Sequence, residues 1–243
     1  MWQWFLHDWS TVGLGAGVVL GLLLFCTDVC RSDPRLSRWR DPVWMSWMFV
    51  FAYLVHNFEE YGIDVVGQRF AFPASMCGLF GYGAPPNCPI GLAFFAAVNV
   101  PLFWIALPLA AVCGRRRPAV GMTGLGIVFA NAMTHIGDGL VHGYNPGLLT
   151  AVVVFLPLSV WAARTFFGDG KLLRLPVLAA IVAISVVLHA LLIALVLAQI
   201  HGALGTVPAS VLQAVVAPVL LLAVPWAAER RWPAPARPVR SPV

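Results

Sequence analysis

Charged residues are scarce in this sequence, and their scarcity excludes a large class of proteins. Of 243 residues, 15 are Lys or Arg and 10 are Asp or Glu, so 10% are charged and 60% are hydrophobic. Soluble domains carry about 25% charged residues, and a mean hydropathy of +0.85 is too high for a chain folded in water. The composition therefore excludes a soluble globular protein and predicts an integral membrane protein.

Cysteine is also sparse, and five residues of this type in a chain of this length exclude a disulfide-stabilised scaffold. We expect Cys26, Cys30 and Cys113 to be reduced, because they lie at or near the predicted cytoplasmic side. Cys77 and Cys88 share one connection on the other side, where an oxidising compartment would allow them to pair. The sequence leaves that disulfide open.

Apolar runs long enough to cross a bilayer, about 20 residues each, are by contrast abundant. They cover residues 10–28, 42–62, 88–113, 118–142, 147–167, 176–200 and 206–228. The prediction is an all-α, polytopic transmembrane helical bundle of about seven spans, forming a single domain over residues 1–229. Residues 230–243 are basic and rich in Pro, which predicts a disordered cytoplasmic tail.

Basic residues are almost missing from one side of this predicted topology. All 15 Lys and Arg residues except Arg69 lie at the end of the first, third, fifth or seventh span or after it. The positive-inside rule makes that side cytoplasmic, so we expect an outside N-terminus, a cytoplasmic C-terminus and a multi-pass location in the inner (plasma) membrane. Basic clusters placed between spans anchor a protein in the membrane, so we expect no nucleic-acid partner.

The second predicted span ends in the polar stretch "HNFEE". His56, Glu59 and Glu60 are spaced by three and four residues, which places both carboxylates beside the imidazole on one helix face. One acid at the centre of a membrane helix costs on the order of 3 kcal/mol, so two adjacent acids need a function. The alternative is a helix end at the outer interface with solvated charges.

A second polar stripe lies in the fourth predicted span. At 100° per residue, Asn131, His135, Asp138 and His142 fall within an arc of about 60°. Such alignment favours a shared site over separate hydrogen bonds to different helices, which is the alternative reading.

Three histidines share one predicted depth in the membrane. At 1.5 Å per residue, His56 lies about 21 Å above Pro42, His135 about 26 Å above Pro118 and His189 about 20 Å above Pro176. These prolines mark helix starts next to cytoplasmic arginines. The histidines therefore fall in one layer in the outer half of the bilayer, although His189, alone among apolar residues, could also be purely structural.

Imidazoles and carboxylates that converge in a dry environment are ligands for zinc or non-haem iron. We therefore hypothesise one or two divalent metal ions, an enzyme that hydrolyses, hydrates or oxidises a hydrophobic or lipid-like substrate, and Asn131 as an orienting residue. One of Glu59 and Glu60 would bind metal while the other acts as general acid or base. The candidate metal ligands are His56, Glu59, Glu60, His135, Asp138, His142 and His189.

Two other functions use the same residues. A metal-free acid/base pair would suit the cyclisation or isomerisation of a terpenoid or sterol-like lipid. A cation or proton path is the third reading, and it ranks last because the polar layer is confined to the outer half. Oligomeric state is left open.

The motifs "HNFEE", "NAMTH" and "YNPG" together resemble the bacterial membrane proteins named for their HXXEE motif, over residues from about 42 to 160. The resemblance implies that the motif residues, Tyr144 among them, belong to the functional set, and it names no reaction. A weaker likeness is to seven-span membrane terpene cyclases. Those proteins have an acid near the last span, and residues 206–228 contain none.

Overall fold

Seven long helical segments make up most of the structure, a computed structural model that describes residues 2–233. Within these residues there is no β-strand, and the all-helical prediction is confirmed. The uninterrupted segments are α1 (Trp2–Cys26), α2 (Pro42–Tyr61), α10 (Leu175–Ile200) and α11 (Thr206–Arg231). The interrupted ones are α4–η2–α5 (Leu92–Asn99, Val100–Ala106, Leu107–Cys113), α6–α7 (Pro118–Gly121, Thr123–His142) and α8–η3–α9 (Leu148–Thr150, Ala151–Phe155, Leu156–Phe166).

Six of the segments are long and apolar enough to cross a membrane, which identifies a multi-pass membrane protein. The segment outside these six is α2, the second predicted span. It is helical as expected, but His56, Asn57, Glu59 and Glu60 lower the hydropathy of its last turns. Helix α2 is not among the six because it carries the polar stretch noted in the sequence.

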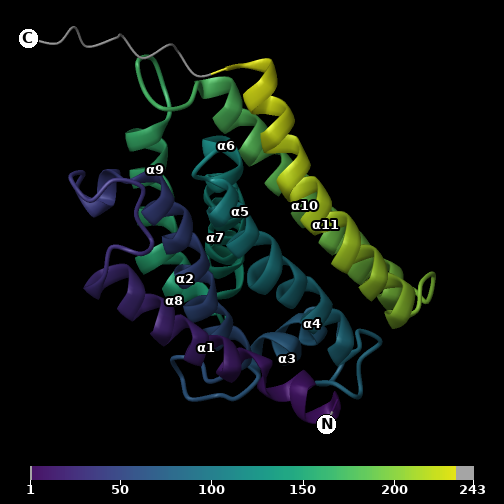
Figure 1. The fold of residues 1–243 in the computed structure, drawn as a ribbon. Coiled ribbons are helices and arrows are strands. Elements are labelled where there is room, and N and C mark those ends of the chain that lie inside the picture. The colour runs from purple at the N-terminus through teal and green to yellow at the C-terminus, as the bar shows by residue number, and fades with distance from the viewer. Residues whose placement is uncertain (1, 234–243) are drawn as a thin grey trace, which may run out of the picture.

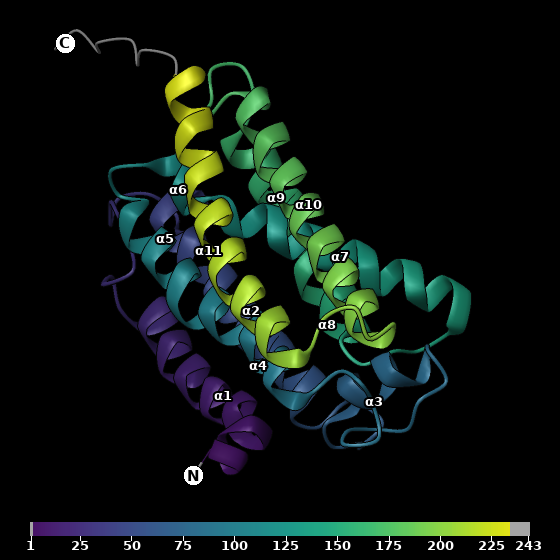
Figure 2. The ribbon, with the colours of Figure 1, turned by 90° about the vertical axis from the view of Figure 1, so that its right-hand side faces the viewer.

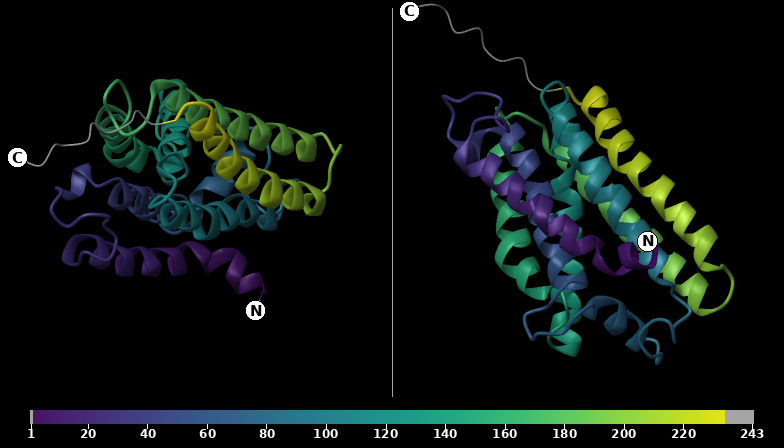
Figure 3. Two further views of the ribbon diagram at one scale, coloured as in Figure 1. Left: turned by 45° about the horizontal axis from the view of Figure 1, so that its top comes forward. Right: turned by 60° about the horizontal axis from the view of Figure 1, so that its bottom comes forward.

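Helix α2 lies in the middle of the bundle, and most of its residues are buried. It packs against α1 on one side and against α5 and α7 on the other. Helices α10 and α11 form a pair on the far side of the bundle from α1 (Figures 1 and 3). The polar end of α2 is thus enclosed by neighbouring helices.

Small residues let α7 approach both neighbours closely. A Cβ atom on Gly124 would lie 2.5 Å from Cβ of Phe49 in α2, and one on Gly126 would lie 2.5 Å from the carbonyl oxygen of Ile181 in α10. Close backbone approach at small residues is a common way to associate membrane helices. The close approach at these two glycines places α7 between α2 and α10 (Figure 2).

Prolines and caps set the helix starts as the sequence predicts. Pro42, Pro118 and Pro176 each occupy the first or second position of a helix. Asp41 caps α2 by accepting hydrogen bonds from the backbone N–H groups of Val43 and Trp44 at 2.9 and 3.1 Å.

The long connection after α2 contains a short helix that the sequence did not predict, α3 (Ala71–Gly78). It also contains the disulfide that the sequence left open, because Cys77 and Cys88 are bonded. Cys26, Cys30 and Cys113 are free, as expected.

The predicted tail begins inside a helix. Helix α11 continues to Arg231, and Arg230 lies over the ring of Trp226 at 3.9 Å from its centroid. The first residues assigned to the tail are therefore helical, and residues 234–243 lie outside the described part of the chain.

Candidate metal centre

Three of the candidate ligands converge between α2 and α7. His56 and Glu60 occupy the last turns of α2, and His135 lies on the facing side of α7. Glu60 Oε1 is 3.5 Å from His56 Nε2 and 3.2 Å from His135 Nε2. Ligand atoms of the three residues lie within 4.8 Å of one another. We call His56, Glu60 and His135 the central cluster.

The central cluster is shielded from solvent. The side chain of His56 has 0% exposure, and those of Glu60 and His135 have 5% and 6%. The His56 ring packs against Phe155, with ring centroids 4.5 Å apart. At this burial an unpaired carboxylate is costly, so its partners decide whether the site is stable.

The hydrogen-bond network assigns the protonated nitrogen of His56. Its Nδ1 lies 2.6 Å from Thr150 Oγ1, and that hydroxyl lies 2.6 Å from Glu59 Oε2. A hydroxyl has one proton to donate, and the carboxylate of Glu59 takes it. The Thr150 oxygen therefore accepts from Nδ1–H, and neutral His56 presents a lone pair at Nε2.

The same logic applies to His135. Asn145 Nδ2 donates to the backbone carbonyl of His135 at 3.0 Å, which fixes the orientation of the amide. Asn145 Oδ1 then faces His135 Nδ1 at 2.7 Å and accepts its proton. Neutral His135 also presents a lone pair at Nε2.

With both histidines neutral, the central cluster consists of three acceptors that face one another. Within the described residues, His56 Nε2 has no hydrogen-bond partner. Two imidazole lone pairs and a carboxylate attract a cation or a shared proton. A hydrogen bond from the other ring nitrogen to an oxygen acceptor is the usual support of a metal-binding histidine.

Gly147 holds both rings in place from the loop between α7 and α8. A Cβ atom at this position would lie 2.6 Å from Cε1 of His135 and 2.8 Å from Cε1 of His56. Its φ of +98° also favours glycine. The backbone of Gly147 therefore packs directly on both imidazoles.

Glu59 faces a helix N-terminus instead of joining the central cluster. Its carboxylate accepts hydrogen bonds from the backbone N–H groups of Leu149 and Thr150 at 3.1 and 2.9 Å, besides the Thr150 hydroxyl. Free N–H groups at a helix start favour such an anion. Glu59 thus ties α2 to the start of α8.

Asp138 and His142 are not brought into the central cluster. They bond to each other at 2.7 Å, and their side chains are 31% and 58% exposed. The last turns of α7 extend beyond the neighbouring helices (Figure 2), and Leu140 there is 84% exposed. The predicted polar stripe is continuous along α7, but the C-terminal turns of α7, which carry Asp138 and His142, are not enclosed by other helices.

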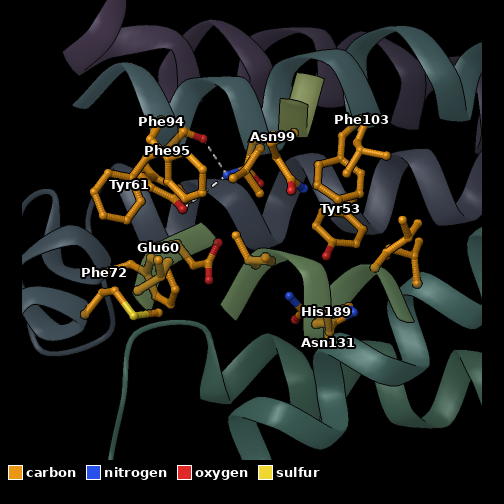
Figure 4. A pocket seen from close by; sticks show the side chains of 18 residues that line it. Tyr53, Glu60, Tyr61, Phe72, Phe94, Phe95, Asn99, Phe103, Asn131 and His189 are labelled. Carbon is orange, nitrogen blue, oxygen red and sulfur yellow. Dashed lines mark hydrogen bonds between the residues drawn. The ribbon is translucent and has the colours of Figure 1, made fainter. Parts of the chain in front are cut away.

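His189 and Asn131 line a cavity next to the central cluster, and Glu60 borders the same cavity (Figure 4). His189 Nδ1 bonds to the carbonyl of Ser185 at 2.8 Å, so its proton is on Nδ1 and Nε2 is the free acceptor. Asn131 Oδ1 has no partner within the described residues. The cavity has a volume of about 60 Å³, and its aromatic walls include Tyr53, Tyr61, Phe72, Phe94, Phe95 and Phe103.

Tyr144, the motif residue in the loop after α7, is 41% exposed. Partial desolvation and the nearby carboxylates of Asp64 and Glu59 raise its pKa to about 12. The phenol is therefore neutral at physiological pH and can act as a hydrogen-bond donor.

Asn145 and Thr150 are the functional residues that sequence reasoning missed. Asn145 stands in the quoted "YNPG" motif, and Thr150 follows it by five positions. A polar residue in a loop next to a histidine-bearing helix is the pattern that could have identified them, because metal-binding histidines need a second hydrogen-bond partner.

Comparison with known proteins agrees with the motif resemblance. Residues 47–162 match the model of the family described as "Protein of unknown function with HXXEE motif". No curated protein and no solved structure matches the chain. The matched region contains the central cluster together with Gly147, Asn145 and Thr150. The resemblance to the HXXEE-motif family is thus confirmed over residues 47–162.

Proposed function

We propose that this protein is a membrane enzyme that uses one divalent metal ion, held by His56, Glu60 and His135, to act on a small apolar substrate. The observation that carries the proposal is the meeting of three buried acceptors with both histidines supported at Nδ1. The ion would be zinc or non-haem iron, since both accept two imidazoles and a carboxylate.

The spacing of the ligand atoms supports a metal. Tetrahedral zinc with bonds of about 2.0–2.1 Å places its ligand atoms about 3.3 Å apart. Glu60 Oε1 lies 3.5 and 3.2 Å from the two Nε2 atoms. Three protein ligands leave at least one position open for water or substrate, which is typical of catalytic sites.

The adjoining cavity supports the substrate class. Its volume of about 60 Å³ is small compared with the roughly 300–1,000 Å³ of most ligand pockets. Its aromatic walls favour an apolar molecule, and its size favours a small or slender one over a fused-ring lipid. Glu60 borders the cavity, so a substrate would meet the metal from that side.

His189 supports attack by a metal-activated water, as in hydrolysis or hydration. A metal ion lowers the pKa of its bound water and makes it a nucleophile at neutral pH. The free Nε2 of His189 would accept a proton at the cavity wall, and Asn131 Oδ1 would orient the substrate. Oxidation of the same substrate is the variant expected if the ion is iron.

We further propose that α2 crosses the membrane as a seventh span, because the segments around it enclose its polar end. The arginine distribution supports an outside N-terminus, a cytoplasmic C-terminus and insertion in the inner membrane. The disulfide between Cys77 and Cys88 lies at the predicted outer side, where oxidation is possible.

The runner-up is metal-free acid/base chemistry at the same residues. A distance of 3.2 Å between Glu60 Oε1 and His135 Nε2 also suits a shared proton. That arrangement would support isomerisation or cyclisation. A proton or cation path stays the third reading.

Elemental analysis of the detergent-purified full chain separates the first reading from the others. After chelation and re-addition of Zn²⁺ or Fe²⁺, the wild type should bind one ion per chain, and a His56→Ala, His135→Ala double variant should bind almost none. Glu60→Gln, which preserves side-chain size, repeats the test if the double variant unfolds. Equal metal content in wild type and both variants, or no binding by the wild type, overturns the proposal.

A further inference from the structure

A large hollow lies at the arginine-rich end of the bundle, away from the central cluster. It is lined by the loop before α2, which contains the short helix η1 (Arg38–Arg40), and by residues of α2, η3 and α9. Its volume is about 930 Å³, at the upper end of the range of about 300–1,000 Å³ for ligand pockets. Nothing in the proposed chemistry uses this hollow.

One part of the wall of the hollow is apolar, and the other part is basic and aromatic. Its lower part consists of apolar side chains, Met48, Val153, Val154, Pro157 and Leu158. These belong to α2 and to the candidate membrane segment Leu148–Phe166, only 33% of whose most apolar stretch is buried in the protein. This part of the wall therefore faces acyl chains.

The upper part is basic and aromatic. Arg35 and Arg40 line it, and an adjoining hollow that shares Arg40 adds Arg164. Arg35 is paired with Asp33 at 3.0 Å, whereas no acidic residue in the described part of the chain pairs with Arg40 or Arg164. Two unpaired guanidinium groups above an apolar wall are complementary to a phosphate with attached hydrocarbon.

Two tryptophans make the hollow a formed feature of the fold. Trp161 Nε1 donates to the carbonyl of Trp39 at 3.0 Å, and the two rings meet edge to face with centroids 6.2 Å apart. This contact holds the loop before α2 against α9. Tryptophan at this depth is typical of the membrane interface.

From these features we infer that the hollow binds an anionic phospholipid, with the phosphate at Arg40 and Arg164 and the acyl chains along η3 and α9. A soluble phosphate would use the arginines but not the apolar wall. A zwitterionic lipid would use the wall, but its own cation would compete for the phosphate.

Native mass spectrometry of the full chain in detergent tests the inference. The probes are phosphatidylglycerol and phosphatidylcholine with identical acyl chains. The wild type should retain one phosphatidylglycerol in preference to phosphatidylcholine. Arg40→Ala with Arg164→Ala should weaken that binding by about 25-fold, since each arginine near an anionic lipid contributes about fivefold.

Two matched controls separate a site from general attraction. Arg116→Ala with Arg117→Ala removes the same charge from another loop and should leave binding unchanged. Val153→Trp should fill the hollow and weaken binding without a change of charge, whereas Val152→Trp, outside the hollow, should not. Equal retention of the two lipids, equal loss in the Arg116/Arg117 variant, or displacement of the lipid by glycerol phosphate at equal concentration overturns the inference.

Discussion

Helix α7 carries two histidines on one polar stripe, and each of them contacts a carboxylate in a different environment. His135 meets Glu60 of another helix at 3.2 Å, in a site where both side chains are at most 6% exposed. His142 meets Asp138 of its own helix at 2.7 Å, with 58% and 31% exposure. Exposed pairs of this kind contribute about 0–1 kcal/mol, whereas a buried site requires partners for every polar atom.

What faces the other ring nitrogen explains the difference. Nδ1 of each histidine contacts a side-chain oxygen, that of Asn145 for His135 and that of Asp138 for His142. Nε2 of His135 then faces Glu60 in a buried site, whereas within the described residues Asp138 and His142 belong to no group of three possible ligands. A ligand set is therefore recognised by what converges on the ring nitrogen that is left free.

Substitution of Glu60 by Gln should have the largest effect on metal binding. The change removes the only carboxylate of the central cluster while preserving its size, so metal affinity should fall by more than the roughly 100-fold typical of an outer-shell change. Competition with a chromogenic chelator measures it. Asp138→Asn is the matched control on α7 and should bind metal as the wild type does. An equal loss of metal affinity in Asp138→Asn would contradict the assignment of the metal to Glu60 and His135.

Gly147→Ala should come next, because the new methyl group collides with both imidazoles. We expect metal affinity to fall by about 100-fold and the free energy of unfolding to fall by more than the roughly 1–3 kcal/mol of backbone strain. Gly143→Ala is the control, since Gly143 also has a positive φ, of +87°, but a Cβ atom added there would meet no atom within 4 Å. Gly143→Ala should lower the free energy of unfolding in detergent through backbone strain and should leave metal affinity unchanged. Identical stability and metal affinity of the two variants would contradict the role of Gly147.

Thr150→Val should have an intermediate effect. The change removes the acceptor of His56 Nδ1 and one donor to Glu59, which should weaken metal binding by about 10–100-fold and cost about 1–3 kcal/mol of stability. Thr134→Val, on the exposed side of α7, removes a hydroxyl that bonds only a local carbonyl. Isothermal titration should separate the two threonines, and equal affinities would show that Thr150 does not orient His56.

The smallest effect is expected from Asp138→Asn combined with His142→Ala. Both side chains face outward and satisfy each other, so the double variant should change stability by less than about 1 kcal/mol. Thermal unfolding in detergent measures it. A large loss of stability would mean that this end of α7 has a partner that the isolated chain does not show.

The helices could be predicted from the sequence because the features that define them are local. Long apolar runs bounded by proline and arginine gave all seven segments to within a few residues, apart from the earlier start of α1 and the later start of α4. The π-helical segments η2 and η3 were not foreseen. Their sequences hold or precede Pro101 and Pro157, and proline disrupts the regular helix hydrogen bond.

The central cluster could be predicted only in part from the sequence. Residue types and helical spacing placed His56, Glu60 and His135 on facing stripes, but they could not decide between Glu59 and Glu60, which flank His56 equally. The choice depends on where α8 begins, since its N–H groups take Glu59. Asp138 and His142 continued the stripe in sequence, and only packing shows that α7 has left the bundle there.

X-ray absorption at the edge of the bound metal tests the ligand set of the central cluster directly. For the wild type, reconstituted with Zn²⁺ or Fe²⁺, we expect scattering from two imidazole ligands per ion, with oxygen completing the shell. We expect His135→Ala to lose the bound ion or to show one imidazole, and His142→Ala to be unchanged. A wild-type spectrum without imidazole, or one that survives in His135→Ala and changes in His142→Ala, would contradict it.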